Sequence, residues 1–123
     1  MQVDHAVLAV AALAASLPWY EALMPLLGFT KTRQHVWMNA EGFAVDVQQA
    51  KDPAHGYKRE GVGLNHLAVR AGSRAEVDEV AGAMKAAGFE VAATQELGEA
   101  YALLVKDRDG MRIEVTFEPG GGE

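Results

Sequence analysis

The sequence predicts an α+β fold made of two tandem βαβββ modules, which together form one domain with a cupped mixed sheet and helices on its outer face. The first observation is a pattern of one strand, one helix and three strands over residues 3–48, which then restarts. The second is a repeated landmark. A histidine precedes a Gly-Phe pair by 23 residues in one half and by 22 in the other, from His5 to Gly28 and from His66 to Gly88.

In the first module, a run of Val, Leu and Ala around one histidine predicts a buried strand at residues 3–10. A helix is expected to begin at the capping residue Ser16 and to end at Gly28, where glycine favours a left-handed cap. Three short strands should follow, with a turn at residues 39–42 between the last two. These strands are expected at residues 30–34, 35–39 and 43–48.

The second module is expected at about residues 62–119, after a first module at about 1–50 and an exposed, charged linker at 51–61. Ser73 and Glu76 have the spacing of a capping box, which predicts the start of the second helix. Eight extra residues precede the last strand, because Gly88 lies 26 residues before Glu114, whereas Gly28 lies 18 before Asp46. Strands are expected at 64–70, 90–94, 101–106 and 111–117, with a turn at 107–110 and the extra residues at about 95–100.

Composition restricts the classes of function. The chain has 123 residues, the size of one domain, and a net charge of −6, which disfavours nucleic acid as a partner. The apolar segment at residues 7–17 is too short to span a membrane, and no signal peptide is expected. Cysteine is absent, which excludes disulfides and thiolate ligands and fits a cytoplasmic location. The tail Gly120 to Gly122 predicts a frayed end.

Two imidazoles and two carboxylates occupy equivalent positions in the two halves. His5 and His66 lie on the first strand of each module, and Asp46 and Glu114 lie on the last. Because side chains alternate along a strand, the carboxylates lie opposite the Val and Ile residues that should face the helices. All four side chains are therefore expected to face the inner side of the sheet.

Neutral imidazoles and carboxylates together suit a borderline divalent cation such as Zn, Ni, Mn, Fe or Co. A single histidine on a strand is usually only a core or surface residue, but its repetition favours a metal site. We expect His5, His66 and Glu114 to bind one divalent ion. Asp46 is expected to be a fourth ligand or, because its side chain is short, a general base that acts through water.

Three segments of the chain resemble the vicinal oxygen chelate superfamily, which includes glyoxalases, extradiol dioxygenases, fosfomycin-modifying transferases and bleomycin-binding proteins. The most specific segment is residues 107–114, with an acidic turn, a glycine and a final glutamate. Residues 63–69 and 19–29 also resemble family segments, and the likeness extends over about residues 3–117. The resemblance implies a glyoxalase-like fold, with two βαβββ modules around a metal-lined cup.

The resemblance also implies roles for single residues. His5, His66 and Glu114 match the metal ligands of the family, and Asp46 lies where its members vary. Lactoylglutathione lyases have glutamate at the position of Asp46 and arginine at the position of Ala9, so glutathione is not the expected substrate. The family further implies a homodimer, which would also cover open sheet edges.

Four other side chains are candidates for the site or for simple packing. Tyr101 could donate a hydrogen bond to a substrate oxygen, or pack as an edge tyrosine. His35 and Trp37 could line the cup and contact substrate, although packing is the plainer interpretation of the tryptophan. Arg112 shares a face with Glu114, so it is either an anion clamp for substrate or a neutralising partner for the carboxylates.

Two classes of function follow from these residues. The first is a metal-dependent enzyme that acts on a small molecule through two adjacent oxygen atoms, by isomerisation, lyase chemistry, dioxygenation or thiol transfer. The second is a metal-free binding protein that sequesters a toxic ligand. The presence of three candidate metal ligands, His5, His66 and Glu114, favours the enzyme. Measuring the metal content of the purified protein would separate the two classes.

Overall fold

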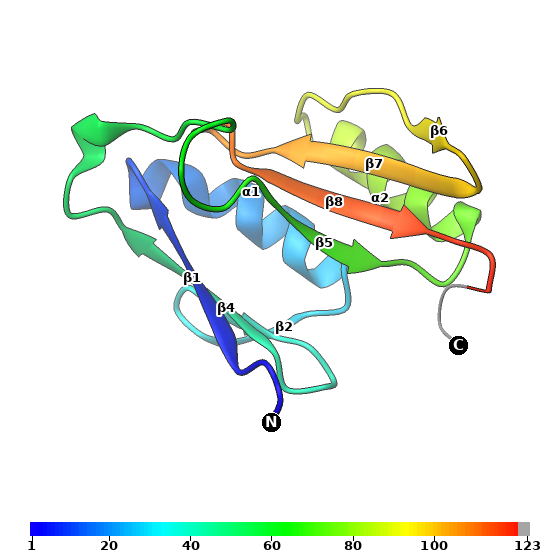
Figure 1. Ribbon diagram of the computed structural model, residues 1–123. Coiled ribbons are helices and arrows are strands. Elements are labelled where there is room, and N and C mark those ends of the chain that lie inside the picture. The colour runs from blue at the N-terminus through cyan, green and yellow to red at the C-terminus, as the bar shows by residue number, and fades with distance from the viewer. Residues whose placement is uncertain (121–123) are drawn as a thin grey trace. The chain divides into compact units, whose positions relative to one another are not determined.

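The computed structural model describes residues 1–120, and the chain divides into two compact units, Met1–Gly56 and a second that begins at Tyr57 (Figure 1). Each unit contains one strand, one helix and three further strands in that order, which confirms the α+β class and the tandem βαβββ modules. The union of the modules in one cupped sheet stays a prediction. Of the predicted frayed tail, Gly121 and Gly122 lie outside the described residues.

The first unit has the strand order β1-β4-β3-β2, in which β1 runs parallel to β4 and the other pairs are antiparallel. Its elements are β1 (His5–Val10), α1 (Leu13–Leu26), β2 (Thr30–Arg33), β3 (Val36–Met38) and β4 (Ala44–Gln49). A short 3-10 helix, η1 (Pro53–His55), lies in the predicted linker. Aromatic and aliphatic side chains fill the core, among them Tyr20, Leu23, Trp37, Val45 and Val47.

The second unit repeats this topology with the order β5-β8-β7-β6, and β5 runs parallel to β8. Its elements are β5 (His66–Arg70), α2 (Arg74–Ala86), β6 (Gln95–Leu97), β7 (Ala100–Lys106) and β8 (Arg112–Phe117). The core is formed by Val77, Met84, Leu103, Ile113 and Val115. In the described part of the chain, neither of these helices has the length and apolar character that crossing a bilayer requires.

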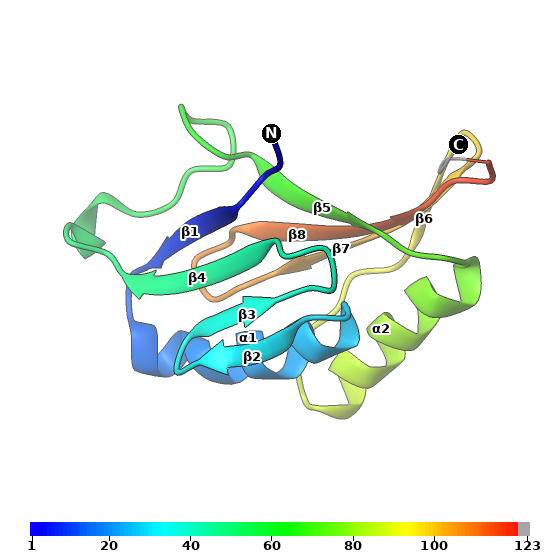
Figure 2. The ribbon, with the colours of Figure 1, turned by 90° about the horizontal axis from the view of Figure 1, so that it is seen from below.

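In each unit the helix packs on one face of the sheet, and alternation along the last strand decides which residues it covers. Helix α2 contacts β7 and β8, and Figure 2 shows it along one face of their sheet. Ile113 and Val115 are 0% and 2% exposed on that face, whereas Glu114 between them is partly exposed on the other. Asp46 has the same relation to the buried Val45 and Val47. The predicted face assignment is therefore confirmed within each unit.

The turns that precede the two last strands are built alike. In the first, the Gly42 N–H donates to the Asn39 carbonyl at 3.1 Å, and the Asn39 side chain accepts from the Phe43 N–H at 2.9 Å. In the second, Asp107 takes the place of Asn39, and its Oδ1 accepts from the Met111 N–H at 3.0 Å. Gly42 has a φ of +88°, a conformation that favours glycine. This shared turn is further support for the duplication.

Two elements differ from the prediction because contacts with other elements of the same unit determine them. Helix α1 begins at Leu13, not at Ser16, since the Leu13 N–H donates to Gln49 Oε1 on β4 at 3.0 Å. Residues 90–94 form no strand, and β6 lies instead in the segment predicted to hold the extra residues. It forms there because Glu96 pairs in register with Tyr101 on β7.

The two helices give opposite expectations for a Ser→Ala substitution. Ser73 Oγ caps α2 by accepting from the Glu76 N–H at 3.1 Å, so Ser73→Ala should lower the free energy of unfolding by about 1 kcal/mol. Ser16 is 1% exposed, and among the described residues its hydroxyl has no hydrogen-bond partner. Ser16→Ala should therefore raise the free energy of unfolding by about 1 kcal/mol. Urea denaturation followed by circular dichroism measures both, and equal effects of the two changes would contradict this assignment.

Candidate functional site

The helix-free face of the second unit brings together an imidazole and a carboxylate. His66 on β5 lies beside Arg112 in register, and Ala68, two positions along, lies beside Glu114 on β8. His66 Nε2 and Glu114 Oε1 are 3.9 Å apart, with side chains 40% and 19% exposed. They are close enough to act on one ligand, and both remain accessible to it.

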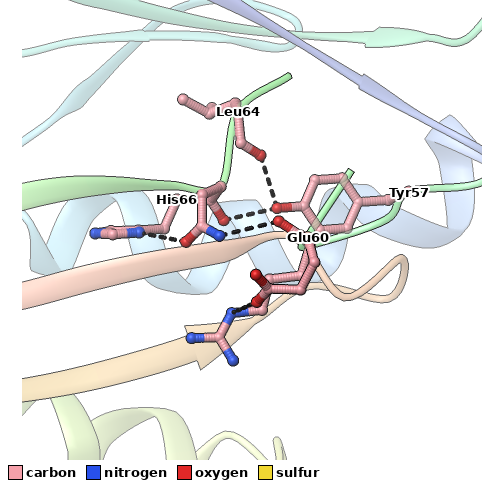
Figure 3. A network of polar contacts seen from close by, with 6 residues as sticks. Tyr57, Glu60, Leu64 and His66 are labelled. Atoms are coloured by element: carbon pink, nitrogen blue, oxygen red, sulfur yellow. Dashed lines mark hydrogen bonds and ion pairs between the residues drawn. The ribbon is translucent and has the colours of Figure 1, made fainter. Parts of the chain in front are cut away.

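The other ring nitrogen of His66 is occupied. His66 Nδ1 lies 2.8 Å from Asn65 Oδ1, and the Asn65 amide nitrogen donates to the Arg59 carbonyl at 2.9 Å. The Tyr57 hydroxyl lies close to the carbonyls of Leu64 and Asn65, as Figure 3 shows for Leu64. The segment from Tyr57 to His66 is thus tied together directly before β5.

The first unit has the equivalent residues in the same register but with different contacts. His5 pairs in register with Ala44, which lies two residues before Asp46 on β4. In the same way, the register partner of His66 lies two residues before Glu114 on β8. His5 Nδ1 contacts Asp4 Oδ2 at 2.6 Å, whereas Asp46 accepts from Gln48 Nε2 at 2.8 Å. Aspartate has one methylene fewer than glutamate, which accounts for a contact between the first-strand histidine and the last-strand carboxylate in the second unit and not in the first.

His35 is the imidazole nearest to Asp46. It lies in the turn before β3, where its carbonyl accepts from the Val47 N–H at 2.9 Å. His35 Nδ1 is 3.9 Å from Asp46 Oδ1, and this buried atom has no hydrogen-bond partner among the described residues. The structure therefore places His35 beside Asp46, another predicted site residue, and its role as a substrate contact stays a prediction.

Trp37 lies away from that face. It pairs in register with the fully buried Val45 and stacks on Tyr20 of α1, with ring centroids 6.4 Å apart and planes at 29°. Its ring is 1% exposed. The expectation that Trp37 lines the cup is corrected, because neighbouring residues of β3 point to opposite faces and the helix covers the face that Trp37 occupies.

Tyr101 also lies on a helix-covered face. It is the second residue of the inner strand β7, but its hydroxyl donates to Asp78 of α2 at 2.6 Å and lies 2.8 Å from Thr94 Oγ1. The Arg74 guanidinium lies 4.6 Å from the Tyr101 ring centroid. The geometry gives Tyr101 a structural contact between β7 and α2, and the prediction that it acts on substrate finds no support in this arrangement.

The same helix carries an ion pair that fixes β6. Arg74 donates to both carboxylate oxygens of Glu96, at 2.6 and 2.7 Å. The hydrogen bond to Arg74 lowers the pKa of Glu96, and the hydrogen bond to Glu96 raises the pKa of Arg74. Both side chains are well exposed, so water screens the pair and its contribution to stability is small.

The donor atoms of His66 and Glu114 suit a metal ion. Ligand bonds of about 2.0–2.2 Å place two ligating atoms roughly 3 Å apart, so a separation of 3.9 Å needs only a small side-chain rotation. Within residues 1–120 the structure has no group of three or more His, Asp or Glu side chains arranged to hold a metal. His66 and Glu114 therefore fit as two ligands of a larger set.

Three residues near the site were not predicted from the sequence. Asn65 and Asp4 each precede a site histidine and contact its Nδ1, and Tyr57 fastens the backbone before His66. A sequence signal for the first two exists, since an Asn or Asp directly precedes the strand histidine in both modules. Tyr57 lies outside the segments that repeat, so the repeat could not reveal it.

Comparison with known proteins gives a family match over most of the chain. The model of the Glyoxalase/Bleomycin resistance protein/Dioxygenase superfamily matches residues 2–115. No curated protein matches the chain.

Several solved structures share the fold. A glyoxylase/bleomycin resistance protein/dioxygenase domain from Frankia sp. EAN1pec is 20% identical, with a TM-score of 0.78 over 96% of this chain and 92% of that one. A possible glyoxalase from Bacillus cereus is 27% identical, with a TM-score of 0.68 over 94% and 97%. A lactoylglutathione lyase from Agrobacterium tumefaciens is 17% identical, with a TM-score of 0.67 over 99% and 97%.

Proposed function

Because this chain belongs to the glyoxalase/bleomycin resistance protein/dioxygenase superfamily, we propose that it is a metal-dependent enzyme acting on a small molecule with two adjacent oxygen atoms. The observation that carries the proposal is the pair of His66 and Glu114, 3.9 Å apart on the open face of the second unit. The same residue classes recur in the same register at His5 and Asp46.

In this proposal His66, Glu114 and His5 hold one divalent ion. Asp46 is the fourth ligand, or a base that takes a substrate proton through water. When bound, the ion supplies Lewis acidity that polarises the two substrate oxygens. Arg112, directly beside His66 in register, places a permanent positive charge where an anionic substrate can pair with it.

His35 has a distinct part in the proposal. Its buried Nδ1 lies 3.9 Å from Asp46 and lacks a hydrogen-bond partner among the described residues, so this nitrogen can orient Asp46. The side chain as a whole is 34% exposed, so its outer part can contact a bound substrate. The reaction class stays open among isomerisation, lyase chemistry, dioxygenation and thiol transfer. A metal-free protein that sequesters a ligand is the alternative, and the lack of a three-ligand group within the described residues is the observation in its favour.

Metal content decides between the two. Protein purified without chelator is expected to contain one first-row divalent ion per chain by elemental analysis. After chelation, adding Mn, Fe, Co, Ni or Zn should raise the melting temperature, because a ligand that binds the folded state stabilises it. Metal-free protein whose melting temperature none of these ions changes would exclude the enzyme and leave the sequestration protein.

We also propose that the protein is a homodimer in the cytoplasm. β1 and β5 are edge strands of their sheets, and edges of this kind are usually paired or covered. Sedimentation at micromolar concentration tests the dimer, and a monomer under those conditions would remove it.

A further inference from the structure

We propose that Asn65 and Tyr57 are positioning residues that hold His66 with its proton on Nδ1, so that the unprotonated Nε2 faces Glu114. The inference rests on the proposed function, because it assigns these two residues to the metal role of His66. Neither residue touches the ion in this proposal.

The hydrogen bonds of Asn65 fix where the proton lies. Asn65 Nδ2 lies 2.9 Å from the Arg59 carbonyl, and a carbonyl can only accept, so the amide NH2 group must face Arg59. The amide oxygen then faces His66 Nδ1 at 2.8 Å. Because that oxygen can only accept, Nδ1 must carry the proton.

Tyr57 holds the backbone from which the histidine projects. Its hydroxyl oxygen is 2.8 Å from the Leu64 carbonyl and 2.6 Å from the Asn65 carbonyl, which belong to the two residues directly before His66. The intervening segment contains Gly61 and Gly63, and Gly63 has a φ of +130°, so this stretch of backbone has considerable freedom. The contacts of the Tyr57 hydroxyl with these two carbonyls therefore restrict where Asn65 and His66 can lie.

The consequence concerns metal affinity. A neutral imidazole binds a metal through its unprotonated nitrogen, and the hydrogen bond at the other nitrogen decides which one that is. Without such a partner, imidazole favours the tautomer protonated on Nε2, which removes the lone pair from the side facing Glu114. The first unit shows the same device, with Asp4 Oδ2 2.6 Å from His5 Nδ1.

The test reads the tautomer directly. Nitrogen-15 NMR of the His66 ring in metal-free protein, at about pH 8.5 where an ordinary histidine is neutral, should show the proton on Nδ1. Asn65→Ala should shift the population toward the Nε2-protonated form, and Tyr57→Phe should shift it in the same direction by less. Asn65→Asp keeps an acceptor, as in Asp4, and should restore the wild-type tautomer.

Metal titration of the same variants completes the test. Asn65→Ala should weaken binding of Zn or Ni by about 10- to 100-fold, and Asn65→Asp should recover most of that loss. An unchanged tautomer in Asn65→Ala, or a shifted tautomer with unchanged metal affinity, would overturn the inference. If the tautomer shifts but the wild-type protein binds no metal, the orienting contact stands and the proposed function fails, so the two failures are distinguishable.

Discussion

Trp37→Ala is expected to lower the free energy of unfolding by about 3–5 kcal/mol, the usual cost of removing a large aromatic side chain from a core. The ring is 1% exposed, stacks on Tyr20 and has the Lys31 ammonium 5.8 Å from its centroid. A loss of this size is a large part of the stability of a small protein, so we expect the variant to be partly unfolded even without denaturant. Trp37→Phe, which keeps an aromatic ring, should unfold at an intermediate denaturant concentration.

Met38 supplies a matched control. It is the next residue of β3, points to the opposite face and is 39% exposed, so Met38→Ala should change the free energy of unfolding by less than about 1 kcal/mol. Chemical denaturation followed by circular dichroism measures all three variants. If Trp37→Phe retained full stability but lost binding of a small-molecule ligand, Trp37 would line the site after all.

The sequence predicted the repeated topology because the signals for it are local. Alternation on the last strands places Glu114 and Asp46 opposite buried Val and Ile residues, and burial in the structure follows that alternation. The capping box at Ser73 is also a local signal, and its serine accepts the expected hydrogen bond from the Glu76 N–H. The Glu76 carboxylate accepts a hydrogen bond from the Gly72 N–H, whereas the capping box predicts that it accepts from the N–H of Ser73, one residue later.

The remaining features depend on side chains that are distant in the sequence. Gln49 on β4 accepts from the Leu13 N–H and so extends α1 beyond the start that Ser16 indicated. Arg74 on α2 binds Glu96 and helps to place β6 where no strand was expected. The Tyr101 hydroxyl is likewise engaged by a distant residue, because Asp78 on α2 accepts a hydrogen bond from it. The hydrophobic periodicity of the sequence does not predict such contacts.

The contact between Asp46 and His35 shows a limit of reasoning from the repeat. Equivalence with Glu114 predicts that Asp46 should approach His5, and the register agrees. The shorter side chain contacts His35 and Gln48 instead. The position of Asp46 along its strand could be predicted from the sequence. The imidazole that its carboxylate contacts depends on the length of the side chain, which is one methylene group shorter than that of Glu114.

His66→Ala is expected to weaken binding of the divalent ion by at least about 100-fold while the fold survives. Loss of a residue that only orients a ligand already costs about 10- to 100-fold in affinity, so loss of the ligand itself should cost at least as much. The fold should persist because His66 lies on the helix-free face with 40% of its side chain exposed, away from the core around Ile113. Calorimetric titration with Zn or Ni measures the affinity, and circular dichroism checks the fold.

His55→Ala separates loss of a ligand from loss of any histidine. His55 is exposed in η1, and the one hydrogen bond of its ring among the described residues is to the neighbouring Gly56 carbonyl, at 2.9 Å, so the affinity of this variant should equal that of the wild type. Glu114→Gln should weaken binding as His66→Ala does, because the amide lacks the negative charge that a divalent ion favours. Full metal occupancy in His66→Ala, with a native circular dichroism spectrum, would show that the ion is held elsewhere and that the open face of the second unit is not the metal site.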